Sequence, residues 1–201
     1  MNDEDTGIRR PVGIRRSPAL VKAFELAEEA HSDQRRKDGR PYIEHPTQVA
    51  QLLDDVGAEE EILVAAVLHD SVEDSELGVD EIRESFGGRV ADLVEALTED
   101  STIESWVDRK EDMRRRVAAL GPGAGAIYTA DKIVNLREVL KLYAFHGERA
   151  GELEKAPTLD HRVEAWNADL AMAVEVGVLD GLCRYFSIEL NGLERAREGE
   201  I

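Results

Sequence analysis

The stretch EEEILVAAVLHDSVED, residues 59–74, changes character twice along its length. It begins with three glutamates, is apolar from Ile62 to Leu68, and continues into the adjacent pair His69-Asp70. A helix that is apolar on all sides is normally buried, and acidic residues at its start interact favourably with the positive end of the helix dipole. The stretch therefore predicts a central, buried helix that ends at ionisable side chains.

Helical periodicity continues on both sides of this stretch, and strand-like alternation is almost absent. Ser17-Pro18 is typical of a helix start, and Gly57 and Gly121 are typical of helix ends. We therefore expect an all-α fold, a compact single-domain helical bundle. The expected helices are 17–31, 45–57, 59–69, 80–86, 89–97, 106–120, 126–143, 159–176 and 179–197. In the helix 159–176, the apolar spacing predicts that Val163, Trp166, Leu170 and Val174 face the core.

The composition restricts the class of protein. A chain of 201 residues with 42% hydrophobic residues is long enough for one domain with its own core, which we place at 17–197 after a flexible segment 1–16, with closing helices from about 158. The charged amino terminus and short apolar runs disfavour secretion and a membrane span. The single Cys183 excludes an intrachain disulfide, as expected in the cytoplasm. A net charge of −18 disfavours nucleic-acid polymers and anionic lipid as partners. The oligomeric state stays open.

The acids that follow the His69-Asp70 pair make it a stronger candidate for a functional site. If the chain stays helical, Glu73 and Asp74 return to nearly the same face as Asp70. Three carboxylates on one face repel one another, whereas a divalent cation would convert that repulsion into coordination. The alternative is that HDSVEDSE, residues 69–76, is an acidic loop in solvent.

Two distant segments offer further ligands of the same kind. His45 stands at a helix start in PYIEHP, where it either points inward or has a capping role. Asp131 lies within an apolar helix, so it is either a buried ligand or a rim residue paired with Lys132. Together with His69 and Asp70 they make a mixed nitrogen and oxygen set that suits Mn²⁺, Fe²⁺ or Zn²⁺. The remaining histidines are interpreted as structural or solvent-facing: His31, His146 and His161.

One short segment is basic although the chain is acidic. Residues 34–40 contain Arg35, Arg36, Lys37 and Arg40 against a single acid, Asp38. Arginine forms paired hydrogen bonds with phosphate oxygens, so the segment is a candidate phosphate-binding loop. The alternative is a solvated loop with no ligand.

Taken together, these motifs resemble a known family. The arrangement of a histidine, an adjacent His-Asp pair and a distant aspartate is similar to that of the HD-domain metal-dependent phosphohydrolases. Within that superfamily, AHSDQRRKDGRPYIEHPTQVAQLL, LHDSVEDS, FGGRVADLVEALTE, RKEDM and ADKIVNLRE resemble the hydrolase domain of the bifunctional alarmone synthetase-hydrolases and their standalone small relatives. The resemblance covers about 19–143, with the motifs in order, and weakens after Tyr143.

The resemblance implies a role for each matching residue. It places the metal ligands at His45, His69, Asp70 and Asp131, with Mn²⁺ as the expected cofactor and Fe²⁺, Zn²⁺ or Mg²⁺ as other possibilities. It implies that Glu73 and Asp74 position and activate the attacking water. It implies that the nucleotide is contacted by Arg36, Lys37, Lys110 and Asn135. Ser75, Asp38 and Arg40 depart from the usual pattern, which leaves the details of substrate recognition open.

The activity expected from the resemblance is that of the family. It is hydrolysis of the 3′-pyrophosphate of (p)ppGpp, the alarmone of the stringent response, to give GDP or GTP and pyrophosphate, without a synthetase domain. Two alternatives stay open. One is an HD phosphohydrolase for another nucleotide, such as a deoxynucleoside monophosphate or NADPH. The other is a catalytically silent nucleotide-binding module.

Overall fold

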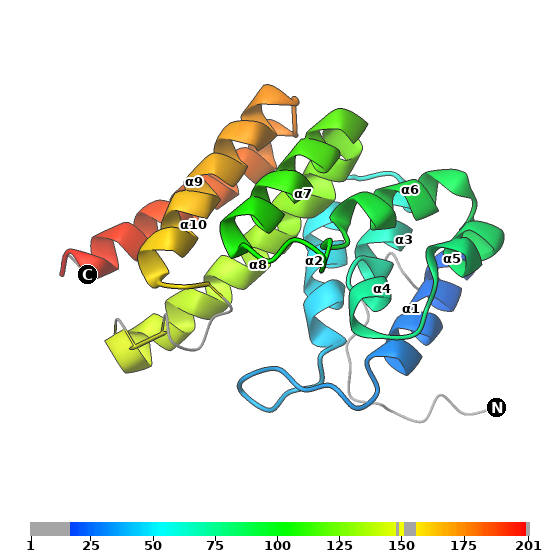
Figure 1. Ribbon diagram of the computed structural model, residues 1–201, viewed down its shortest axis with the longest axis horizontal. Coiled ribbons are helices and arrows are strands. Elements are labelled where there is room, and N and C mark those ends of the chain that lie inside the picture. The colour runs from blue at the N-terminus through cyan, green and yellow to red at the C-terminus, as the bar shows by residue number, and fades with distance from the viewer. Residues whose placement is uncertain (1–16, 148, 151–155, 200–201) are drawn as a thin grey trace.

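The computed structural model describes residues 17–147, 149–150 and 156–199, and the expected flexible segment 1–16 lies outside them. The secondary-structure elements of the described residues are all helices, joined by turns and loops, with a single isolated β-bridge between Arg35 and Pro41 (Figure 1). The all-α prediction is therefore confirmed. None of the described helices is both long and apolar enough to cross a membrane. The helices are α1 (Pro18–Ala30), α2 (Glu44–Asp55), α3 (Glu60–Leu68), α4 (Ser71–Asp74), α5 (Val79–Phe86), α6 (Gly88–Leu97), α7 (Trp106–Leu120), α8 (Pro122–His146), α9 (Leu159–Glu175) and α10 (Asp180–Arg197).

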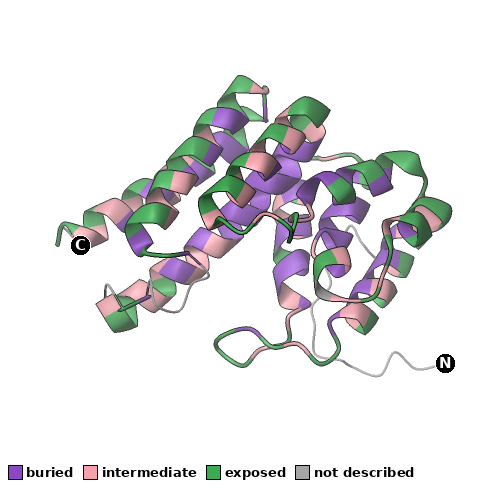
Figure 2. Cartoon of the chain, viewed as in Figure 1, coloured by how far each residue is buried: buried purple, intermediate pink, exposed green. Residues whose placement is uncertain are grey.

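Helix α3 is the buried centre of one half of the molecule. Every residue from Ile62 to Leu68 is buried, as the apolar run predicts, and α3 packs against α1, α2, α6 and α8. Figure 2 shows this concentration of buried residues in α3 and in the middle of α8. Because α3 is enclosed on all sides, the residues that follow it are held at a fixed place in the core.

Local signals in the sequence set several helix boundaries. The Ser17 Oγ accepts a hydrogen bond from the Leu20 N–H at 3.4 Å, and Pro18 occupies the first turn of α1. Gly121, with a φ of +89°, ends α7 and allows Pro122 to start α8 directly. Helix α8 is therefore longer at both ends than the expected 126–143, and its 25 residues span about 37 Å.

Two glycines in α8 allow α3 and the segment before α10 to pack closely against this helix. A Cβ at Gly123 would lie 2.9 Å from Ile62 Cδ1 in α3, and a Cβ at Gly125 would lie 2.7 Å from Val178 Cγ2 before α10. Helix α8 packs against α2, α3 and α6 on one side and against α9 and α10 on the other. Helix α8 thus joins the amino-terminal helices α2, α3 and α6 to the carboxy-terminal helices α9 and α10, as Figure 1 shows.

The expectation for Val174 is wrong. Its side chain is 63% exposed, whereas Trp166, Asp169 and Ala173 are buried. These three recur at the i, i+3, i+7 spacing of one helix face, and Val174 lies about 100° further round the helix than Ala173. The apolar pattern is right for Trp166, which is buried, and for Val163 and Leu170, which are partly buried against the core. It wrongly includes Val174 and misses the buried polar Asp169.

Candidate active site

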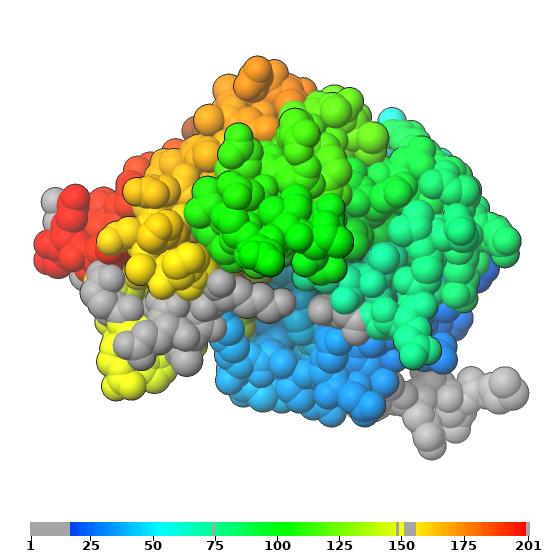
Figure 3. Space-filling view, in the orientation of Figure 1, coloured from blue at the N-terminus to red at the C-terminus, as the bar shows by residue number. Residues whose placement is uncertain are grey.

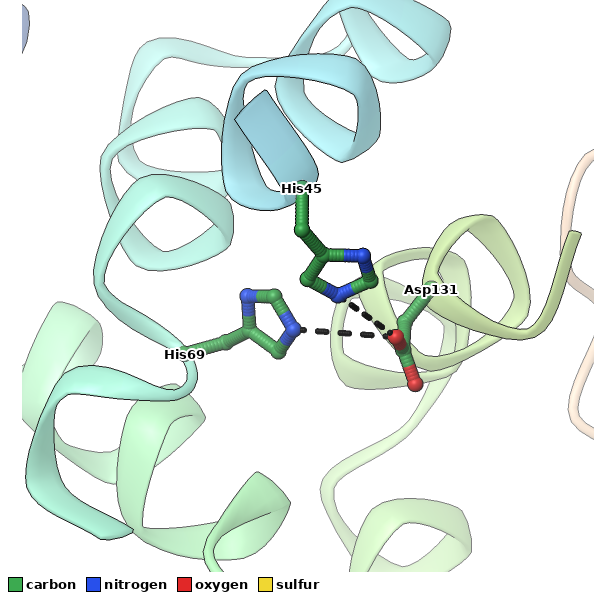
Figure 4. A group of neighbouring side chains, drawn as sticks. All are labelled: His45, His69 and Asp131. Carbon is green, nitrogen blue, oxygen red and sulfur yellow. Dashed lines mark ion pairs between the residues drawn. The ribbon is translucent and has the colours of Figure 1, made fainter. Parts of the chain in front are cut away.

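Three helices bring His45, His69 and Asp131 to one place. His45 is in the first turn of α2, His69 follows the last residue of α3, and Asp131 is in the middle of α8. All three are buried, and their potential ligand atoms lie within 4.8 Å of one another. In Figure 4 both imidazoles point toward one oxygen of Asp131, with His45 Nε2 at 3.0 Å and His69 Nε2 at 3.8 Å from Oδ1.

The surroundings of the two ring nitrogens of His69 indicate that the group of His45, His69 and Asp131 can hold a cation. Its Nδ1 lies 2.8 Å from the carbonyl oxygen of Ala66, which can only accept, so Nδ1 carries the proton. In a neutral ring, Nε2 then presents a lone pair, yet this buried atom has no hydrogen-bond partner among the described residues. It lies 3.2 Å from Asp70 Oδ1. A lone pair facing carboxylate oxygens needs a proton or a metal between them, so the donor set fits a divalent cation.

Asp70 and Asp131 are each held by neighbours. Asp70 Oδ2 accepts a hydrogen bond from the Tyr42 hydroxyl at 2.7 Å, and Asp131 accepts from Lys132 Nζ at Oδ2 and from Asn135 Nδ2 at Oδ1, both at 2.6 Å. Both interpretations of Asp131 therefore hold in part, because it is buried in the core and is also paired with Lys132. Burial raises the pKa of Asp131, but the Lys132 charge and the two imidazoles outweigh burial and hold that pKa well below its usual range. Asp131 is thus an anion, which is the form in which a carboxyl group binds a metal.

A pocket of about 450 Å³ opens beside these groups. Figure 3 shows the loop before α2, in light blue, on the same face of the molecule as α7, in green. The substrate-contact residues expected from the resemblance all line the pocket, as do Asp70 and Glu73. Its basic lining residues are Arg35, Arg36, Lys37, Lys110, Lys132 and Arg162.

Two of the expected contact residues are held by acids. The Arg36 side chain is 4% exposed and forms a two-point ion pair with Glu138 of α8, and Lys110 of α7 pairs with Glu99. Burial and the nearby Lys132 lower the pKa of Lys110, although Glu99 acts in the opposite direction. Both cations are therefore fixed in the wall of the pocket before any ligand arrives.

The acids after Asp70 lie on a short helix. Residues 71–74 form α4, so they do not make the solvent loop that was the alternative. Glu73 is exposed, lines the pocket, and accepts a hydrogen bond at Oε2 from the Glu99 N–H at 3.4 Å. The side chain of Asp74 lies outside the described part of the structure. Glu73 therefore lies in the wall of the same pocket as Asp70.

Several pocket residues were missed from the sequence. The guanidinium of Arg162 in α9 lies over the rings of Trp106 and Trp166, at 5.9 and 5.2 Å from their centroids. The i, i+4 spacing of Arg162 and Trp166 was the available signal, but nothing in the sequence places Trp106 beside them. The other missed lining residues are Tyr42, Leu97, Glu99, Met113, Tyr128 and Glu138.

Comparison with known proteins identifies the domain. A family model described as HD domain matches residues 23–143, which include every residue of the buried group and most of the pocket. The chain belongs to the HD-domain family. The matched residues extend from α1 to near the end of α8, so α9 and α10 are additions to the part of the HD domain that the model describes.

The relatives of this HD domain carry two activities in their names. Some are named as hydrolases, and others, such as one from Streptomyces antibioticus, are named GTP pyrophosphokinase. The guanosine-3′,5′-bis(diphosphate) 3′-pyrophosphohydrolase MESH1 of Mus musculus is 40% identical over 124 residues, which are 60% of this chain and 69% of that protein. A guanosine-3′,5′-bis(diphosphate) 3′-pyrophosphohydrolase of Aquifex aeolicus is 36% identical over 156 residues, 74% of this chain. The match spans only 22% of the length of the Aquifex protein.

Solved structures share the HD-domain fold. A crystal structure from Listeria monocytogenes EGD-e superposes with a TM-score of 0.64 at 31% identity and covers 77% of this chain and 98% of that one. A metazoan ortholog of SpoT, which hydrolyzes ppGpp, superposes with a TM-score of 0.67 at 24% identity over 92% of this chain and 98% of that one. The second likeness supports the fold and includes α9 and α10, because it covers nearly the whole chain.

A rising pH should have opposite effects on two properties of the HD-domain site. The stability of the metal-free protein should fall, and the affinity for a divalent metal should rise. Burial lowers the pKa of His69, but Asp70 and Asp131 outweigh burial and raise it from 6.5 to about 9 without metal. A raised folded-state pKa adds stability that is complete below pH 6.5 and is lost as the pH rises through about 9. A metal must displace that proton, so its affinity rises over the same interval, by about tenfold per pH unit for one proton.

Thermal unfolding in EDTA and in Mn²⁺ measures both trends. In EDTA the Tm should fall between pH 6.5 and 9, while the stabilisation added by Mn²⁺ should grow. His69→Gln, which lacks the titrating ring, is the control and should lose this component of the pH dependence. A metal-free Tm that rises over the interval in the wild type would contradict the assignment.

Proposed function

We propose that this HD-domain chain is a metal-dependent (p)ppGpp 3′-pyrophosphohydrolase that releases GDP or GTP together with pyrophosphate. The observation that carries the proposal is the buried group of His45, His69 and Asp131, which opens into a pocket with basic walls in a chain of net charge −18. The activity named for the mouse and Aquifex relatives supports the same conclusion.

The distribution of basic residues favours a substrate with more than one phosphate group. Arg36 and Lys37 come from the loop before α2, whereas Lys110, Lys132 and Arg162 come from α7, α8 and α9. A nucleotide with phosphates at both the 5′ and 3′ positions offers anions to each set at once. A simple phosphomonoester would use only one of them. The chemistry of the pocket therefore supports an alarmone.

We propose His45, His69, Asp70 and Asp131 as the metal ligands. Two imidazoles and two carboxylates suit Mn²⁺, which we take as the cofactor, with Fe²⁺, Zn²⁺ and Mg²⁺ as the other candidates. When bound, a divalent cation polarises a phosphoryl oxygen and makes water easier to deprotonate. Because the substrate is a nucleotide of the cell interior and Cys183 is a single thiol, we expect a cytoplasmic protein.

The chain's own residues supply the remaining steps of the proposed reaction. Glu73 and Asp74 orient the attacking water and take up its proton. Arg36, Lys37 and Lys110 bind the phosphates and the nucleotide, and their charges stabilise the negative charge that develops on the phosphoryl oxygens. Asn135, which donates to Asp131, keeps that carboxylate facing the two histidines. The 3′ oxygen of the ribose leaves with a proton, and pyrophosphate is the second product.

Turnover of ppGpp with Mn²⁺ present, followed by identification of both products, tests this function. We expect GDP and pyrophosphate in equal amounts and loss of turnover in EDTA. Faster hydrolysis of a deoxynucleoside monophosphate or of NADPH would favour another nucleotide as substrate. Bound Mn²⁺ without turnover of any of these nucleotides would favour a silent binding module.

The double replacement Arg36→Ala with Lys37→Ala tests how the substrate is recognised. Loss of these contacts should raise KM for ppGpp much more than it lowers kcat, because binding is removed rather than chemistry. Arg36→Ala leaves Glu138 without its partner, so the activity on ppGpp is compared with that on a small aryl phosphate in the same preparation. Equal losses on both substrates would contradict the proposed role of the loop.

A further inference from the structure

Tyr42 contacts the candidate metal centre, and the proposed reaction assigns it no step. Its hydroxyl donates to Asp70 Oδ2 at 2.7 Å. The other oxygen of the same carboxylate, Oδ1, lies 3.2 Å from His69 Nε2, which is the orphaned ring nitrogen of the site. The two oxygens of Asp70 are therefore not equivalent. Oδ2 accepts the Tyr42 hydrogen bond and lies 3.5 Å from His45 Nε2, whereas Oδ1 faces His69 Nε2 at the shorter distance.

The position of the Tyr42 ring is fixed from several sides. The buried ring of His31 packs on it with centroids 4.7 Å apart, and the ring of His45 lies at 5.7 Å. The Tyr42 N–H donates to the Gln34 carbonyl at 3.2 Å. Such packing leaves the hydroxyl little freedom to move away from Asp70.

The loop that carries Tyr42 is itself closed by backbone contacts. The Arg36 N–H donates to the Arg40 carbonyl at 2.8 Å, and Gly39, with a φ of +86°, makes the turn between them. Residues with positive φ are normally glycine in such turns. The contact of Tyr42 with Asp70 is therefore built into the fold of the loop and of α1, which ends beside His31.

We propose that Tyr42 is a positioning residue of the metal centre, which engages Oδ2 of Asp70 and leaves Oδ1 as the oxygen available to the cation. The inference rests on the proposed function, because it requires that Asp70 be a metal ligand. Hydrogen bonds to ligating carboxylates orient them and raise metal affinity. A carboxylate free at both oxygens can rotate or bind a cation through both, which would take a position that the attacking water needs.

The variant Tyr42→Phe tests this role, because it keeps the ring against His31 and removes only the hydroxyl. We expect its Mn²⁺ dissociation constant to rise by about 10- to 100-fold, as measured by titration of the intact apoprotein with Mn²⁺ and detection of the free ion. Turnover of ppGpp should recover in part when Mn²⁺ is raised to saturate the variant.

Tyr128→Phe is the matched control from the same pocket. Its hydroxyl donates to Asp169 at 2.9 Å, and Asp169 keeps Arg114 as a partner at 3.0 Å. The control also loses one buried hydrogen bond and should lower the Tm in EDTA, but it should leave Mn²⁺ affinity unchanged because Asp169 is not a proposed ligand. The comparison therefore separates an effect on the metal from a general loss of stability.

The outcomes distinguish this inference from the proposed function. A weaker affinity in Tyr42→Phe alone supports the inference. Wild-type affinity in Tyr42→Phe, or an equal loss in both variants, would overturn the inference and leave the metal-dependent function intact. A wild-type chain that binds no Mn²⁺ would overturn both.

Discussion

Asp131→Ala is expected to abolish metal binding and to lower ppGpp turnover by more than about 100-fold. Loss of a residue that only supports a ligand typically costs 10- to 100-fold in affinity, so loss of a ligand itself should cost more. Elemental analysis should find about one Mn²⁺ per chain in the wild type and none in Asp131→Ala or in His69→Ala.

Two further variants make the Asp131 result interpretable. Asp131→Ala leaves the buried Lys132 without its partner and so threatens folding, whereas Asp131→Asn keeps the volume of the side chain. Asp131→Asn should therefore also lose the metal while remaining helical by circular dichroism. The exposed His146 is the control, and His146→Ala should keep both metal and turnover. Undiminished metal in the Asp131 and His69 variants would refute the ligand assignment.

Glu73→Gln combined with Asp74→Asn is expected to keep the metal and to lose most of the turnover, by about 100-fold or more. The amide forms cannot accept a proton from water, but they preserve the size of the side chains. Because Glu73 is exposed and is not one of the buried group, the metal content should not change.

The nearby exposed acid Glu76 provides the matched control for this double variant. Glu76→Gln removes one carboxylate from the same acidic stretch, so it accounts for the change in local charge. It should turn over ppGpp at the wild-type rate. If the double variant did so as well, Glu73 and Asp74 would be surface residues without a part in the reaction.

Most of the helices, though not the short α4, could be predicted from sequence because they carry their own local signals. The Ser17 cap, the positive-φ Gly121 and the uninterrupted apolar run of α3 act within a few residues of where they stand. The error at Val174 has the opposite origin, because the buried face of α9 includes Asp169, whose partners Arg114 and Tyr128 belong to α7 and α8. No local pattern reveals a polar side chain that is buried only because distant helices satisfy it.

The candidate site also has some features that the sequence predicts and others that it does not. His69 and Asp70 stand out because they end a buried helix, and the structure confirms that His45 and Asp131 join His69 in one buried group. Other contacts depend on how segments that are distant in the chain pack together, and no local pattern reveals them. They are the ion pairs of Arg36 with Glu138 and of Lys110 with Glu99, and the approach of Arg162 to Trp106. The catalytic and substrate-contact roles stay predictions, to be decided by the variants above.

The origin of the buried group in three separate helices has a consequence for the amount of protein in a cell. A cation held by α2, the end of α3 and α8 would link segments that are far apart in the chain, and its full set of ligands is assembled only in the folded state. At a free metal concentration one hundred times Kd, this linkage adds about 2.7 kcal/mol to the free energy of unfolding. Under metal starvation the chain would spend more time unfolded and be exposed to proteases, so scarcity of the ion would lower the number of enzyme molecules as well as their individual rates.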